Sequence, residues 1–125
     1  MSETDQALVA QHPEWETPVP CVYTHHTIYM IRDPVVVVMC DFGTVVGVVT
    51  QKDVQHQPSN KTFGDIMKPA VCIDAYATPD EVSATMNAYT YKAFPVVVQR
   101  LIGYPEQHMK PKPIAWTFNR YTTSN

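Results

Sequence analysis

Basic residues, glycine, cysteine and long apolar runs are all scarce in this chain of 125 residues. Nine basic residues stand against twelve acidic ones, and the net charge of −3 argues against non-specific binding to nucleic acid. No apolar run approaches the roughly 18 to 20 residues that cross a bilayer. The polar, acidic start MSETDQALVAQ predicts no signal peptide. We therefore expect a cytoplasmic protein that binds neither nucleic acid nor membrane.

The cysteines also limit the chemistry. Cys21, Cys40 and Cys72 are odd in number and follow no disulfide pattern, which predicts free thiols in a reducing compartment. His25 and His26 stand near Cys21, but their spacing matches no zinc motif. No Ser-His-Asp or Cys-His motif stands out as a catalytic candidate. The sequence thus predicts no metal site, no catalytic residue and no required cofactor.

Hydrophobic residues make up 45% of the chain, and eleven prolines accompany only four glycines. This composition predicts one domain with a modest core, short elements and many fixed turns. Expected strands cover residues 20–23, 35–39, 44–49, 70–75, 95–98 and 113–117. Expected helices cover 2–12, 25–32 (one or two turns at most), 51–57, 61–69 (a short turn) and 78–92, with Ser2, Thr24, Thr50 and Thr78 as caps. The stretch 99–112 is predicted to be an irregular connection.

The stretch 34–53, PVVVVMCDFGTVVGVVTQKD, organises the prediction. Two valine-rich runs flank Asp41-Phe42-Gly43, which is hairpin chemistry with Gly43 free to adopt a positive φ. Both runs are apolar almost without alternation, so we expect burial on both faces. Thr50 and Asp53 suit a helix cap and first turn. One interpretation is a buried hairpin before a capped helix; the other is a site for a phosphate or a ribose.

The two halves of the chain are similar in sequence and form an internal repeat. The Pro-Val run at Pro34 matches that at Pro95, CVYT at 21–24 matches CIDA at 72–75, and GVVT at 47–50 matches IAWT at 114–117. Each half is predicted as strand, helix, strand, strand, short helix. On this alignment the first copy has lost about ten residues of its helix. We expect that loss to expose apolar surface from Ile28, Tyr29 and Ile31, which a partner subunit could cover.

The segment 65–98, DIMKPAVCIDAYATPDEVSATMNAYTYKAFPVVV, resembles a CBS domain, and GVVTQKD at 47–53 matches the family's Gly-hydrophobic-hydrophobic-Ser/Thr-x-x-Asp signature. The resemblance implies an α+β fold of tandem CBS repeats, each a β-α-β-β-α unit, packed about a pseudo-twofold axis. It implies a single CBS-pair module over 1–125. The first repeat, with an N-terminal helix, would span 1–60 and the second 61–125.

The resemblance further implies a small regulatory module that binds an adenosine-containing ligand, such as AMP, ADP, ATP, S-adenosylmethionine or NAD, in one cleft. Gly47 would allow a close approach by a ligand or a facing backbone, Thr50 and Lys52 would meet a phosphate, and Asp53 would accept from the ribose hydroxyls. The apolar walls implied for adenine are Val19, Pro20, Cys21 and Val22 on one side and Pro34 and Val35 on the other.

The second copy departs from the signature. In the sequence alignment Ile114 replaces Gly47, Arg120 replaces Asp53, Thr117 keeps the threonine, and Asn119 lies one position early for the ribose role. We therefore expect at most one nucleotide site.

Two other classes of function stay open. The chain can be an adaptor that keeps the fold without a ligand and binds a partner, or, with less support, a small enzyme that uses the cleft. A homodimer and a separate effector protein are the expected partners.

Overall fold

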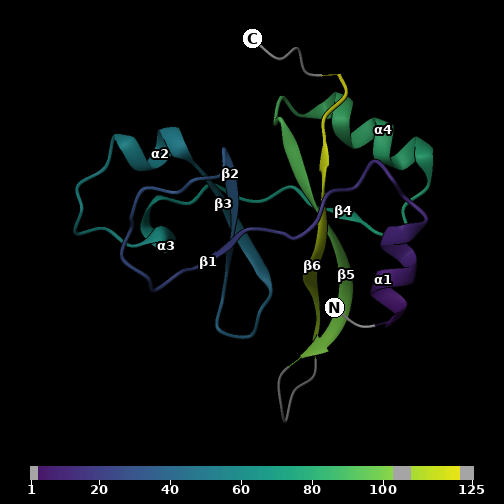
Figure 1. Cartoon of the computed structure of the whole chain (residues 1–125), viewed down its shortest axis with the longest axis horizontal. Coiled ribbons are helices and arrows are strands. Elements are labelled where there is room, and N and C mark those ends of the chain that lie inside the picture. Colours follow the sequence, from purple (N-terminus) through teal and green to yellow (C-terminus); the bar gives the residue numbers. More distant parts are fainter. Residues whose placement is uncertain (1–2, 103–107, 122–125) are drawn as a thin grey trace.

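The computed structural model describes residues 3–102 and 108–121, which form two three-stranded sheets and four helices (Figure 1). The first sheet has the order β1 (Cys21–Tyr23), β2 (Val35–Met39), β3 (Val45–Thr50), and the second has the order β4 (Ile73–Asp74), β5 (Ala93–Ile102), β6 (His108–Phe118). In each sheet the first pair is parallel and the second antiparallel. The helices are α1 (Glu3–Ala10), α2 (Gln51–Gln55), α3 (Phe63–Ile66) and α4 (Pro79–Ala88). Among these described helices, none has the length and apolar character to span a membrane.

Strand β2 is buried on both faces, as predicted, whereas β3 is buried only in part, because Val46 is exposed and Val48 is half-buried. Val37 of β2 packs with Val97 of β5 and Trp116 of β6 in a cluster to which both sheets contribute. The opposite face of the first sheet packs with Phe63 of α3, which is fully buried. In Figure 1, α2 and α3 lie beside the first sheet, whereas α1 and α4 lie beside the second.

In each repeat, the segment that precedes the first strand pairs with a strand of the other repeat. Lys68, which precedes β4, exchanges two backbone hydrogen bonds of 2.9 Å with Val48 of β3. Glu16, which precedes β1, exchanges two of 2.8 and 2.9 Å with Trp116 of β6. Because each segment pairs with the last strand of the other repeat, the two halves are related by an approximate twofold exchange.

The strand ladders define which residues of the two repeats are equivalent. The row Val22–Val38–Gly47 in the first sheet corresponds to the row Ile73–Val96–Ala115 in the second. The lead-in pairs agree, since Val48–Lys68 then corresponds to Trp116–Glu16. On this register Ala115 is equivalent to Gly47, Phe118 to Thr50 and Tyr121 to Asp53.

The predicted repeat alignment is therefore correct for the first strands but wrong for the later ones. Cys21 does match Cys72, but Gly47, Thr50 and Asp53 do not match Ile114, Thr117 and Arg120. The error has a physical cause, because a run of identical valines contains no signal for register. The predicted shortening of the first copy by about ten residues is also too large. Sixteen positions separate Val22 from Val38 and twenty-three separate Ile73 from Val96, a difference of seven.

Most predicted elements are present, with altered ends. The positive φ of Gly43, 77°, and the threonine caps of α2 and α4 are confirmed. The expected strand at 70–75 is reduced to Ile73–Asp74, and α4 ends at Ala88 rather than near Lys92. The proposed cap Ser2 lies outside the described residues.

Two predicted segments are wrong. Residues 25–32 form no helix, because Thr27 instead bridges Thr62 and the Ile28 amide donates to the Lys61 carbonyl. The stretch 99–112 is not an irregular connection where it is described: β5 continues to Ile102 and β6 begins at His108. Residues 103–107 lie outside the described part.

Asn119 closes the gap between β6 and the end of α4. Its side chain is buried, and its Nδ2 group donates to the carbonyls of Met86, Tyr89 and Tyr91 at 3.0, 3.1 and 2.9 Å. Its Oδ1 accepts from the Tyr121 amide at 2.9 Å. The side chain considered for a ribose is thus engaged in holding the second repeat together.

We expect Asn119→Ala to lower the free energy of unfolding by about 1–3 kcal/mol, because buried carbonyls lose their donor. Urea denaturation measures this, with Asn87→Ala on the exposed face of α4 as the matched control. Equal stability of the two variants would contradict the bridging role of Asn119.

Gly47→Ala should also destabilise the chain. A Cβ at this position would lie 2.6 Å from the Met67 Sδ and 2.8 Å from the Lys68 carbonyl oxygen. We expect a loss of about 1–3 kcal/mol from overpacking. The exposed neighbour Val46→Thr, which stays β-branched, should change stability by less than about 0.5 kcal/mol in the same denaturation experiment.

Candidate ligand-binding site

A cavity of about 390 Å³ opens beside β1, and we call it the first-repeat cavity. One wall is Pro20, Cys21 and Val22, with Val36 of β2. The other wall is the segment 29–33, Tyr29 to Asp33. The volume falls within the range of about 300–1,000 Å³ that is common for small-molecule sites. Three of the predicted adenine-wall residues, Pro20, Cys21 and Val22, therefore do lie together on one cavity.

The wall 29–33 replaces the shortened helix of the first repeat. Gln51 at the start of α2 holds this wall in place, since its Nε2 donates to the carbonyls of Ile31 and Arg32 at 3.2 and 2.9 Å. Ile28 and Ile31 are buried in the first-sheet core, so the prediction that they are exposed is wrong. Tyr29 and Met30, at 55% and 57% exposure, carry the apolar surface that remains open.

Thr50 and Asp53 form a reciprocal capping box at the start of α2. The Thr50 Oγ1 accepts from the Asp53 amide at 3.2 Å, and the Asp53 Oδ2 accepts from the Thr50 amide at 3.0 Å. The Asp53 Oδ1 also lies 3.1 Å from the Lys68 Nζ. Burial would raise the pKa of Asp53, but the hydrogen bonds from Thr50 and the nearby Lys68 ammonium outweigh it and lower the pKa. The carboxylate is therefore ionised at neutral pH.

The other predicted site residues are dispersed. Gly47 was expected to allow close approach by either a ligand or a facing backbone. The backbone of Lys68 is what lies against it. Val35 packs between the two sheets, and Pro34 is exposed and accepts from the Gln51 amide at 3.2 Å. Lys52 is exposed on α2. Gly47, Thr50, Lys52, Asp53, Pro34 and Val35 do not line the first-repeat cavity, and Val19 lines a second cavity instead.

Six residues of the cavity were missed by sequence reasoning: Tyr29, Met30, Ile31, Arg32, Asp33 and Val36. A signal for the first five was present. An apolar run too poorly amphipathic for a helix ends in the charged pair Arg32-Asp33, directly before a proline that starts a strand. Such a run is more compatible with an irregular wall that carries polar groups at its end.

The equivalent region of the second repeat has different chemistry. Tyr121 stands where Asp53 stands in the first repeat, and its hydroxyl lies 3.4 Å from the Ser83 Oγ. Arg120 also donates to Ser83, at 2.9 Å. Phe118 takes the place of Thr50, so neither the threonine nor the acid is retained there.

The three cysteines are free thiols. Burial raises the pKa of Cys21, and it raises the pKa of Cys72 to about 11. Within residues 3–102 and 108–121, no group of three or more His, Cys, Asp or Glu side chains is arranged to hold a metal ion.

No family model matches the sequence, and no curated protein does. Solved structures do match. The CBS pair domain of a putative Mg²⁺ transporter from Shewanella oneidensis has a TM-score of 0.67 at 11% identity, over 96% of this chain and 76% of its own. The cytosolic domain of the Mg²⁺ channel MgtE, in complex with ATP, has a TM-score of 0.64 at 18% identity, over 92% of this chain and 50% of its own.

A CBS domain pair/ACT domain protein from Thermotoga maritima gives a TM-score of 0.59 at 14% identity, over 82% of this chain and 84% of its own. These similarities agree with the duplicated sheets and with the α+β composition. The chain therefore has the fold of a CBS domain pair.

Proposed function

We propose that the chain is a regulatory module that binds an adenosine-containing ligand in the first-repeat cavity. The observation that carries the proposal is the composition of that cavity. Its apolar wall at 20–22 faces a segment that ends in Arg32 and Asp33, and Gln51 ties this segment to the helix that carries Asp53. The complex of the MgtE domain with ATP supports an adenine nucleotide as the ligand of this fold.

The proposed roles follow from the chemistry of the side chains. Pro20 and Val22 form an apolar slot for the base, and the exposed Tyr29 ring can stack on it. Arg32 supplies a guanidinium for a phosphate. A carboxylate has about four lone-pair positions, and the contacts with Thr50 and Lys68 occupy two of those on Asp53. Asp53 thus retains acceptor capacity for the two ribose hydroxyls.

The chain offers a matched control for this role of Asp53. Thr62 and Asp65 form the same capping box at the start of α3, with distances of 2.9 and 3.2 Å, and neither residue has a proposed contact with the ligand. Asp53→Asn and Asp65→Asn therefore remove the same helix-start acid, and only the first removes the proposed ribose contact.

In isothermal titration with AMP, we expect Asp53→Asn to raise the Kd by about tenfold or more, because a hydrogen bond to a charged group is lost. Asp65→Asn should leave the Kd unchanged. Arg32→Gln should weaken AMP more than adenosine, since only AMP carries the phosphate. Equal AMP affinity for Asp53→Asn and the unmodified chain would remove Asp53 from the site.

A ligand-free adaptor is the second candidate, and the engagement of Asp53 by Thr50 and Lys68 favours it. In that case Asp53 serves only the fold. Absence of stabilisation by AMP, ADP, ATP, NAD or S-adenosylmethionine in a thermal-shift experiment would support the adaptor, because a ligand of the native state stabilises by mass action.

The lowered pKa of Asp53 predicts a dependence of stability on pH. A carboxylate with a depressed folded-state pKa contributes stability above its unfolded pKa of about 3.9 and loses it as the pH falls through the folded value. Asp53→Asn should cost about 0.5–2 kcal/mol at pH 7, and the difference should vanish near pH 2. Urea denaturation at both pH values measures it. A difference that persists at pH 2 would contradict an effect of the ionised carboxylate.

We also propose a homodimer and a separate effector protein as partners. The exposed side chains of Tyr29 and Met30 lie where the helix of the first repeat is shortened, and they support an interface between two copies of the chain. Ile28 and Ile31 are buried and do not contribute to it. Light scattering should give about twice the 14.1 kDa of one chain at micromolar concentration. Tyr29→Ser with Met30→Ser should shift the species toward the monomer.

A further inference from the structure

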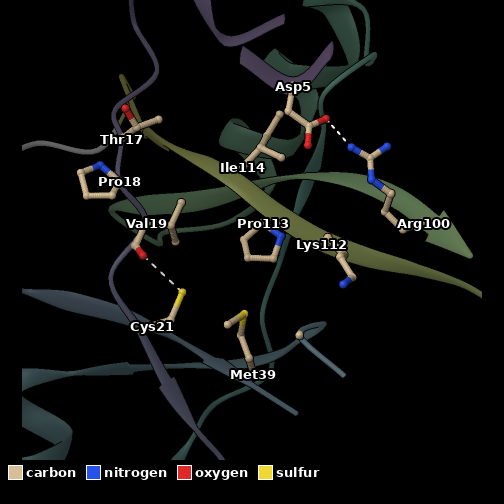
Figure 2. A pocket seen from close by; sticks show the side chains of 11 residues that line it. Asp5, Thr17, Pro18, Val19, Cys21, Met39, Arg100, Lys112, Pro113 and Ile114 are labelled. Carbon is tan, nitrogen blue, oxygen red and sulfur yellow. Dashed lines mark hydrogen bonds and ion pairs between the residues drawn. The ribbon is translucent and has the colours of Figure 1, made fainter. Parts of the chain in front are cut away.

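A second cavity, of about 560 Å³, lies between the repeats, and we call it the inter-repeat cavity (Figure 2). It is bounded by α1, the lead-in at 17–19, β1, the end of β2, Gly43 in the β2–β3 turn, β5 and β6. Cys21 is shared with the first-repeat cavity, and the other lining residues differ. The predicted nucleotide signature does not account for this space.

The walls of the inter-repeat cavity are aliphatic. Its apolar residues are Pro18, Val19, Cys21, Met39, Pro113 and Ile114. No aromatic side chain lines it among the described residues, so a planar base would find nothing on which to stack. The flexible thioether of Met39 and the rigid proline rings instead suit an aliphatic chain.

Among the residues that the structure describes, one cation of the cavity, Lys112, has no carboxylate partner. Asp5 and Arg100 form an ion pair at one side, and Figure 2 shows their charged groups pointing toward each other. Lys112 extends from β6 on the side of Met39, and its Nζ lies 3.4 Å from where a Cβ on Gly43 would stand. Within the described part of the chain, no carboxylate pairs with Lys112.

We propose that the inter-repeat cavity binds an aliphatic carboxylate, with the carboxylate on Lys112 and the chain against Val19, Met39 and Ile114. A single ammonium that has no carboxylate partner among the described residues matches a monoanion, and the neutralised Asp5–Arg100 pair adds no net charge. Apolar walls with a small number of polar groups that fix orientation are the usual composition of small-molecule sites. The proposal is independent of nucleotide binding.

Octanoate is the probe, measured by isothermal titration against the unmodified chain, with octan-1-ol and octylamine as uncharged and cationic analogues. We expect octanoate to bind and both analogues to bind at least about tenfold more weakly. Lys112→Gln should weaken octanoate by a similar factor. Lys52→Gln, an exposed lysine on α2 outside the cavity, should leave its Kd unchanged.

Val19→Phe provides an independent variant that fills the cavity and keeps the lysine. It should abolish octanoate binding while the unfolding transition shows a folded chain. Failure of octanoate to bind the unmodified chain would overturn the proposal. Equal affinity for octan-1-ol, or unchanged affinity in Lys112→Gln, would overturn it as well. AMP titration of Lys112→Gln should match the unmodified chain, which separates this site from the proposed nucleotide site.

Discussion

The reciprocal pairing of the lead-in segments is the constraint on which the rest of the structure depends. Lys68 pairs with Val48, and Glu16 pairs with Trp116, so each repeat completes the last strand of the other. These hydrogen bonds fix the register of both sheets at once. They also bring α3 onto the first sheet and α1 toward the second. The close approach of Lys68 explains why Gly47 can carry no side chain.

The same pairing gives Asp53 two roles that need not conflict. The backbone bridge at Lys68 brings that residue's ammonium to the Asp53 carboxylate, and Thr50 holds the carboxylate from the other side. Both contacts keep it ionised, since each lowers its pKa. A fixed, charged acceptor loses little freedom when a ligand binds, which favours binding by preorganisation. The contacts that make Asp53 structural would thus also prepare it for a ribose.

Local signals in the sequence predicted the elements better than the relations between them. The turn at Asp41-Phe42-Gly43 and the caps Thr50 and Thr78 are determined within a few residues, and each is present as expected. The predicted cap Thr24 begins no helix, because residues 25–32 are not helical. The valine runs predicted the strands correctly. Because neighbouring valines are identical, they could not predict the register, that is, which residues pair across adjacent strands. The register that equates Thr50 with Phe118 comes from pairing between distant segments. For the same reason, the first-repeat cavity could be predicted only on its Pro20–Val22 side.

The seven residues missing between β1 and β2 explain why the two halves of a duplicated fold differ in chemistry. In the second repeat, α4 packs Met86 against Ile73 and Phe94, and its end is closed by Asn119. In the first repeat, no helix fills this place. Ile28 and Ile31 turn into the core instead, and they leave Tyr29, Arg32 and Asp33 along an open wall. A shorter connection therefore exposes polar groups beside an apolar strand, and this asymmetry favours the first repeat as the place where a ligand would bind.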